Sequence, residues 1–193
     1  MPRDAFHDRE RAEEAAYFAQ RDAVLIEKIR NRAKLGEIAL AMADKLRVDD
    51  PALLERIAGL GVTRDTAAAF LLAPLVEIAW ADGHVSPGEH EIIVRMATAR
   101  GVAPDSPDMA QLILWLKVEP PVELFESALA SIKLGLSVLP PHEAEQRATA
   151  MVNACKEVTQ VPGALERLLS LRRSSSPHER STLAEIRTRL GGR

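Results

Sequence analysis

Apolar residues along this chain recur at intervals of three and four positions rather than two. Leu112 and Leu116 show the interval, and it continues through Leu124, Leu129, Ile132, Leu136 and Leu139. This period is typical of an amphipathic helix, whereas a half-buried strand alternates apolar and polar residues. Alternating stretches are short here, and β-branched residues are scattered. The pattern therefore predicts an all-α protein built as a multi-helix bundle.

Proline marks where the helices begin, because it is favourable in a first turn and costly in a helix interior. Seven sites place proline before apolar residues at helical spacing, namely Asp50-Pro51, Ser86-Pro87, Ser106-Pro107, Glu119-Pro120-Pro121, Pro140-Pro141, Val161-Pro162 and Ser176-Pro177. Glycine marks the ends, since Gly61, Gly83 and Gly101 follow apolar runs where a left-handed residue commonly closes a helix. Pro74 lies inside the run 66–81 and predicts a kink there, or two short helices with a tight joint.

The turn before the second of these helix starts carries a recognisable capping sequence. In Ser86-Pro87-Gly88-Glu89, the Ser86 hydroxyl can accept a hydrogen bond from the Glu89 amide. The Glu89 carboxylate can accept one from the Ser86 amide in return, which is the capping box. The same Ser-Pro-x-Glu sequence recurs at residues 176–179. We therefore expect Glu89 to close the N-terminus of a helix.

The acids of this turn are also the candidate metal ligands. Asp82 and Glu89 keep the spacing of the second half of an EF-hand loop, but its first half would place Ile78 and Trp80 at ligand positions without side-chain oxygen. A calcium loop of that type is therefore not expected. The ligands of a divalent ion here would be Asp82 and Glu89, joined by Glu77 or His84 and by water molecules. The alternative is that Glu89 is only a cap and Asp82 only a surface turn residue.

The N-terminal part of the chain, from residue 4 to residue 34, is dense in charges of both signs. A single narrow apolar seam runs through it, formed by Ala15, Phe18, Leu25, Ile29 and Ala33, with Asp22 interrupting. Such a seam favours either a dimeric coiled coil or packing on the main body. We expect residues 1–46 to form a charged amphipathic helix and residues 47–193 to form the helical domain.

Composition argues against several classes of function. The formal charge is −3 and aromatic residues make up 4%, so the chain lacks the basic bias and stacking surfaces of nucleic-acid binding proteins. Cys155 is the only cysteine, which excludes an intramolecular disulfide and a cysteine zinc motif. The N-terminus is too charged for a secretory signal, and no apolar run reaches roughly 18 to 20 residues. These features predict a cytoplasmic protein, with attachment to the inner face of a membrane left open.

No sequence pattern for catalysis stands out. The chain has no Gly-x-Ser-x-Gly element and no glycine-rich phosphate loop. Cys155 has no base indicated beside it, so we expect a small buried side chain rather than a nucleophile. Trp80 and Trp115 lie among aliphatic residues and are expected in the core. We assign no catalytic residue and expect a protein that is not an enzyme, with a site assembled only in the fold as a remaining alternative.

The segment from Val76 to Glu89, within a match over about residues 50–190, resembles the first half of the tellurite-resistance TerB family. Members of that family are all-helical, consist of two related halves and carry an Ala-Asp-Gly turn followed by a glutamate. They have no established enzymatic activity, and they are thought to bind metal ions and to act in membrane-linked stress-response complexes. The resemblance implies a binding module with Asp82 and Glu89 as ligands of a divalent metal ion. The second half departs from the pattern, because residues 154–158 lack an Asp-Gly.

A second resemblance covers residues 5–18. This segment is similar to one shared by mitochondrial ATPase inhibitor proteins and the zeta subunit of some bacterial ATP synthases. There, a helix inserts between catalytic subunits and blocks ATP hydrolysis. The resemblance implies a set of partner contacts, namely Phe6, Arg9, Glu10, Glu13, Glu14, Tyr17 and Phe18. The leading expectation is thus a TerB-like module that binds a protein partner, and the alternative is an inhibitor or accessory protein of ATP synthase.

Overall fold

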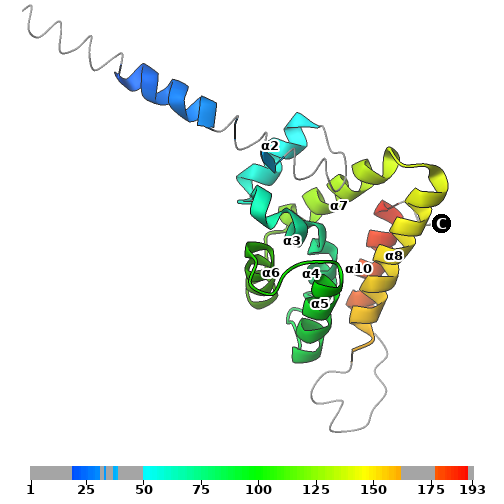
Figure 1. Cartoon of the computed structure of the whole chain (residues 1–193). Coiled ribbons are helices and arrows are strands. Elements are labelled where there is room, and N and C mark those ends of the chain that lie inside the picture. Colours follow the sequence, from blue (N-terminus) through cyan, green and yellow to red (C-terminus); the bar gives the residue numbers. More distant parts are fainter. Residues whose placement is uncertain (1–18, 31–32, 34–36, 39–49, 162–176, 191–193) are drawn as a thin grey trace, which may run out of the picture.

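A computed structural model describes residues 19–30, 33, 37–38, 50–161 and 177–190 of the chain. Over these residues it contains helices and no strand, which confirms the all-α prediction. The elements are α2 (Pro51–Gly59), the 3₁₀ turn η1 (Arg64–Thr66), α3 (Ala67–Leu71), α4 (Ala73–Ala79), α5 (Pro87–Ala99), α6 (Pro107–Lys117), α7 (Val122–Ser137), α8 (Pro141–Thr159) and α10 (Pro177–Arg189). Figure 1 shows their arrangement.

The predicted helix starts are confirmed wherever the structure describes them. Asp50 caps α2, since its Oδ1 accepts hydrogen bonds from the amides of Ala52 at 2.9 Å and Leu53 at 3.2 Å. Ser106 caps α6 by accepting from the Met109 amide at 3.2 Å. Helices α5, α8 and α10 begin at their prolines, and α7 begins directly after one. The start expected at residues 161–162 continues outside the described residues.

The predicted helix ends are also confirmed. Gly61, Gly83 and Gly101 have φ values of +79°, +85° and +89°, the left-handed conformation that glycine adopts without steric cost. Pro74 divides its run into two helices rather than kinking one. The joint is Leu72, between the end of α3 and the start of α4, and Pro74 lies in the first turn of α4, where its missing N–H is not needed.

The N-terminus of α3 is capped by a residue from another helix. The side chain of Thr66, its N-cap residue, makes no capping hydrogen bond. Instead, the amide of Ala69 donates to Oδ1 of Asp108, which lies in the first turn of α6, at a distance of 2.8 Å. This bond spans 39 positions of the chain. It fixes α6 against the start of α3.

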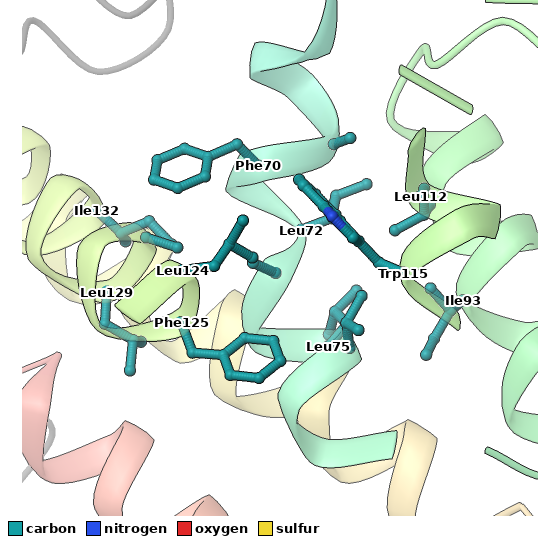
Figure 2. Packing of buried hydrophobic residues seen from close by; sticks show 14 of the residues in the cluster. Phe70, Leu72, Leu75, Ile93, Leu112, Trp115, Leu124, Phe125, Leu129 and Ile132 are labelled. Atoms are coloured by element: carbon teal, nitrogen blue, oxygen red, sulfur yellow. The ribbon is translucent and has the colours of Figure 1, made fainter. Parts of the chain in front are cut away.

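The core is shared by all the helices from α2 to α8, with Ile186 and Leu190 at the C-terminal end. In Figure 2, the segment that carries Phe70 and Leu75 lies in the middle. Leu124 and Phe125 of α7 approach it from one side, and Trp115 of α6 lies on the other side. All five side chains are buried. Burying an aliphatic or phenyl side chain of this size contributes about 1.5–3 kcal/mol, so the apolar residues that set the helical period stabilise the fold substantially.

The C-terminal helix α10 packs against both α8 and α4 (Figure 1). At the other end of the chain, residues 19–30 form a helix that stands away from the body, while Ile38 is buried in the core. Among the helices described, none is long and apolar enough to cross a membrane.

Candidate functional site

The turn between α4 and α5 is the candidate site that the sequence singles out. Helix α4 ends at Ala79, and Gly83 takes its left-handed conformation shortly after. The Asp82 side chain is 19% exposed, and its Oδ1 lies 3.3 Å from Nδ1 of His84, which is 73% exposed. Asp82 therefore lies at the edge of the body with an imidazole beside it.

Glu89 lies on the buried side of the same turn. The residue is 1% exposed. Its Oε2 accepts a hydrogen bond from the Ser86 amide at 2.8 Å, and Ser86 Oγ accepts one from the Glu89 amide at 3.3 Å. The capping box expected from the sequence is thus confirmed. One carboxylate oxygen of Glu89 is committed to the backbone at the start of α5.

The arrangement of these acids bears directly on metal binding. Within the residues that the structure describes, no three His, Cys, Asp or Glu side chains are grouped so that they could hold a metal ion. An ion that used the Oε2 atom of Glu89 would compete with the Ser86 amide for it. Metal binding by Asp82 and Glu89 therefore stays a prediction. In the structure, Glu89 forms the capping box and Asp82 lies beside His84.

Glu77, one helical turn before Trp80, is a carboxyl group whose pKa the fold shifts strongly. Its Oε2 is buried and has no hydrogen-bond partner among the described residues. Burial raises the pKa of Glu77 from 4.5 to about 7. Arg189 of α10 opposes this rise, while the carboxylates of Glu185 and Glu126 add to it. A buried carboxyl group is thus close to half protonated at neutral pH.

Cys155 of α8 lies near this carboxyl group. It is fully buried, as expected, and its Sγ lies 3.9 Å from the carbonyl oxygen of Pro74. Burial raises the pKa of the Cys155 thiol to about 12, the charge of Glu77 raises it further, and Arg100 opposes the shift. The thiolate is the nucleophilic form of cysteine. The environment of Cys155 therefore suppresses its reactivity, in line with a structural role.

The sequence did not reveal a surface cavity that the structure forms along α8. This cavity opens between α7, α8 and α10, and Lys156 and Arg187 are among the residues that line it. The available signal is the spacing on α8, where Ala148, Val152 and Lys156 follow one another at intervals of four. Because α10 follows α8 only after an intervening segment, the periodicity of α8 alone does not reveal that a cavity forms.

The partner contacts implied by the N-terminal resemblance, Phe6, Arg9, Glu10, Glu13, Glu14, Tyr17 and Phe18, lie outside the described residues. The helix at 19–30 follows them directly, and every residue of it is exposed. Leu25 is 58% exposed and Ile29 is 62% exposed. Over these two positions, the apolar seam does not pack on the body. Val24 and Ile26 are exposed as well, at 50% and 49%.

No family model matches the chain, and neither the curated proteins nor the solved structures contain a match to it. The resemblance to the TerB family therefore rests on the segment around residues 76–89, and the resemblance to the ATPase inhibitors rests on residues 5–18.

Proposed function

We propose that this protein is a non-enzymatic, TerB-like helical module that binds a protein partner through its N-terminal helix. The observation that carries the proposal is the contrast between this helix and the others. Helices α2 to α8 bury most of their large apolar side chains in one core, with Leu114 and Val122 among the exceptions, whereas the helix at 19–30 leaves all of its large apolar side chains exposed. Contiguous exposed apolar residues commonly mark an interaction site.

The exposed residues have the geometry of a docking helix. Leu25, Ile26 and Ile29 are spaced at i, i+1 and i+4, which places them on one face. A helix of this kind binds by laying its apolar face into a groove of its partner. Full burial of each of these side chains would contribute about 1.5–3 kcal/mol. Such a short helix is marginal in water by itself, so the partner would also stabilise its conformation.

Charged residues accompany the apolar face and would orient the complex. Arg21, Lys28 and Arg30 lie along the same helix with Glu27, and Asp22, three and four positions before Leu25 and Ile26, shares the apolar face. In interfaces of this kind the apolar anchors supply most of the affinity, while charges at the rim set the register and the rate of association. The proposal thus assigns affinity to Leu25, Ile26 and Ile29, and orientation to the charges.

The TerB resemblance supports the non-enzymatic part of the proposal and suggests its setting. The Asp82 to Glu89 turn carries that resemblance, and a divalent metal ion at Asp82 remains a subsidiary part of the proposal. In this setting the partner belongs to a stress-response complex of the tellurite-resistance type, which would bring the chain to the cytoplasmic face of a membrane. Ile38, which follows the helix at 19–30 in the sequence, is buried in the core.

A second candidate function is inhibition of ATP synthase. It is favoured by one observation, namely that the segment resembling ATPase inhibitors runs directly into a helix standing off the body. In this version the partner is the rotary motor, and the residues from Phe6 to Phe18 insert between its catalytic subunits.

The test compares the wild-type chain with two variants in affinity capture from the native cell. Leu25→Asp combined with Ile29→Asp places charges on the docking face, and both positions are already exposed, so the body should keep its fold. Val138→Asp is the matched control, because Val138 is 49% exposed and lies at the end of α7. A partner that is retained by the control and lost by the double variant supports the proposal. If both variants capture the same proteins, the N-terminal helix is not the docking surface.

The two candidate functions are separated by an activity measurement. Full-length protein is added to the cognate ATP synthase, and the rate of ATP hydrolysis is followed. Inhibition by the wild-type chain would favour the second candidate. An unchanged rate at saturating protein would remove ATP synthase from consideration.

A further inference from the structure

The groove between α2 and α7 has the size of a small-molecule site. Its volume is about 460 Å³, within the range of roughly 300–1,000 Å³ that is usual for ligand pockets. The groove is lined by Asp50, Ala52, Leu53, Arg56, Ala130, Lys133, Leu134 and Ser137. None of these residues belongs to the helix at 19–30, so a role for the α2–α7 groove is independent of the proposed docking function.

Helical spacing brings these side chains to the groove. On α7, Ala130, Lys133 and Leu134 lie at i, i+3 and i+4, which is one face of a helix. On α2, Leu53 and Arg56 lie three positions apart, and α2 packs against α7. Each of the two helices therefore contributes one cation and one leucine to the groove.

The apolar part of the α2–α7 groove is formed by Ala52, Leu53, Ala130 and Leu134. Leu53 is buried in the core, and Leu134 is half-buried and packs against it. An aliphatic chain lying on these residues would remove both its own surface and theirs from water. The gain is about 25 cal/mol for each Å² of apolar area.

Two of the four polar side chains in the groove already have partners. Asp50 Oδ1 accepts hydrogen bonds from two amides in the first turn of α2. The Ser137 hydroxyl donates to a carbonyl oxygen of α7 at 2.7 Å. Arg56 and Lys133, by contrast, have no ion pair and no side-chain hydrogen bond within the part of the chain that the structure describes. The side-chain donors that remain for a ligand are therefore both cationic.

The charges of the groove favour an anion. Arg56 and Lys133 carry two positive charges against the single carboxylate of Asp50. That carboxylate lies at the N-terminus of α2, where the partial positive charge of the helix offsets part of its own. Arg56 lies six positions further on, about 9 Å along the helix axis, so the acid and this cation lie at different points of the groove.

We propose that the α2–α7 groove binds an anionic amphiphile, meaning a small molecule with a carboxylate or similar acidic head and an aliphatic tail. The head pairs with Arg56 and Lys133, because hydrogen bonds between a cation and a carboxylate are stronger than those between neutral groups. The tail lies against Leu53 and Leu134, and its burial supplies the apolar part of the affinity.

The proposal is tested by following the amide resonances of the ¹⁵N-labelled full-length protein while octanoate is added. Acetate carries the same head without the tail, and octyltrimethylammonium carries the same tail with a cationic head. We expect octanoate to shift amides of α2 and α7 until the shifts saturate, with both controls binding at least about tenfold more weakly. Shifts that do not saturate, shifts confined to other helices, or equal binding of the cationic amphiphile would overturn the proposal.

Two variants of the groove locate the head and the tail. Arg56→Gln combined with Lys133→Gln removes both cations. The matched control is Arg95→Gln combined with Lys117→Gln, because these are also exposed cations and lie on α5 and α6. We expect the first pair to weaken octanoate binding at least about tenfold and the control pair to leave it unchanged. Ala130→Trp fills the groove from an exposed position and should abolish binding while the helical circular dichroism stays the same. Wild-type affinity in either groove variant would refute the site.

Discussion

The indole Nε1 of Trp80 donates a hydrogen bond to the backbone carbonyl oxygen of Trp115 at 2.8 Å. Trp80 is the C-cap residue of α4, and Trp115 lies in the last turn of α6. The last carbonyl groups of a helix have no partner within the helix. The indole therefore satisfies one of them and ties the beginning of the Asp82 turn to the end of α6.

Loss of this bond should weaken the fold measurably. In Trp80→Phe the ring remains apolar, but the Trp115 carbonyl oxygen loses its donor in a partly buried position. We expect the free energy of unfolding to fall by about 1–2 kcal/mol, measured by urea unfolding and far-ultraviolet circular dichroism. Stability equal to that of the wild type would mean that water replaces the indole at no cost.

Glu77 should make stability depend on pH near neutrality. The pKa of Glu77 is about 7 in the folded chain, whereas the ordinary value of 4.5 applies to the unfolded chain. Between pH 4.5 and 7 the folded chain therefore holds a proton that the unfolded chain has released. Stability therefore falls as pH rises from about 4.5 to 7 and then levels off. The Glu77→Gln variant cannot ionise, so it should match the wild type near pH 4 and exceed it at pH 8, by about 1–2 kcal/mol once solvent screening is allowed for.

Urea unfolding at the two pH values provides the measurement, with Glu55→Gln as control. Glu55 is an exposed residue of α2, so its substitution should leave the pH dependence of the wild type unchanged. A Glu77→Gln variant whose stability falls with pH as steeply as that of the wild type would contradict the assignment to Glu77. The charged and titratable groups that act on the pKa of Glu77 are Arg189, Glu185 and Glu126. The charge of Glu77 in turn raises the pKa of Cys155 on α8.

The same glycine-to-alanine substitution should have opposite effects at two positions. At Gly83, where φ is +85°, alanine adopts a strained conformation although a Cβ atom would meet nothing within 4 Å. We expect a loss of about 1–2 kcal/mol there. Gly59 closes α2 without a positive φ and also has open space, so alanine should stabilise the protein by about 0.4–1 kcal/mol. Thermal unfolding of the two variants would show the difference, and a gain in stability at Gly83 would refute the backbone argument.

The metal component of the TerB resemblance is tested by calorimetric titration with calcium, manganese and zinc. The resemblance predicts binding that Asp82→Asn abolishes and Glu89→Gln weakens. Glu89→Gln should also lower thermal stability slightly in the absence of metal, because it removes a negative charge from the first turn of α5. No binding by the wild type would remove metal from the proposal, and binding that survives both substitutions would place the ion elsewhere.

Much of the fold could be predicted because its boundaries are local. Proline, a capping side chain or a left-handed glycine acts on residues within one turn, so Ser86 and Gly83 are informative without any knowledge of the tertiary structure. The division at Pro74 follows the same logic, and the alternative of two short helices is the one observed.

The features that were not predicted depend on contacts between distant segments. The raised pKa of Glu77 comes first from burial against other helices, and the carboxylates of Glu185 on α10 and Glu126 on α7 add to it. The cavity beside Lys156 requires α10 to lie along α8. No spacing within a single helix encodes either arrangement, because each arises where separate segments meet.

The bond between the Ala69 amide and Asp108 has a consequence for how the fold forms. Helix α3 is short, and a side chain in the first turn of α6 caps it where its own N-cap residue does not. Its opening turn is therefore completed only once a much later stretch of polypeptide has arrived. Amide exchange of these two segments should then proceed as one cooperative unit, protected together or opened together.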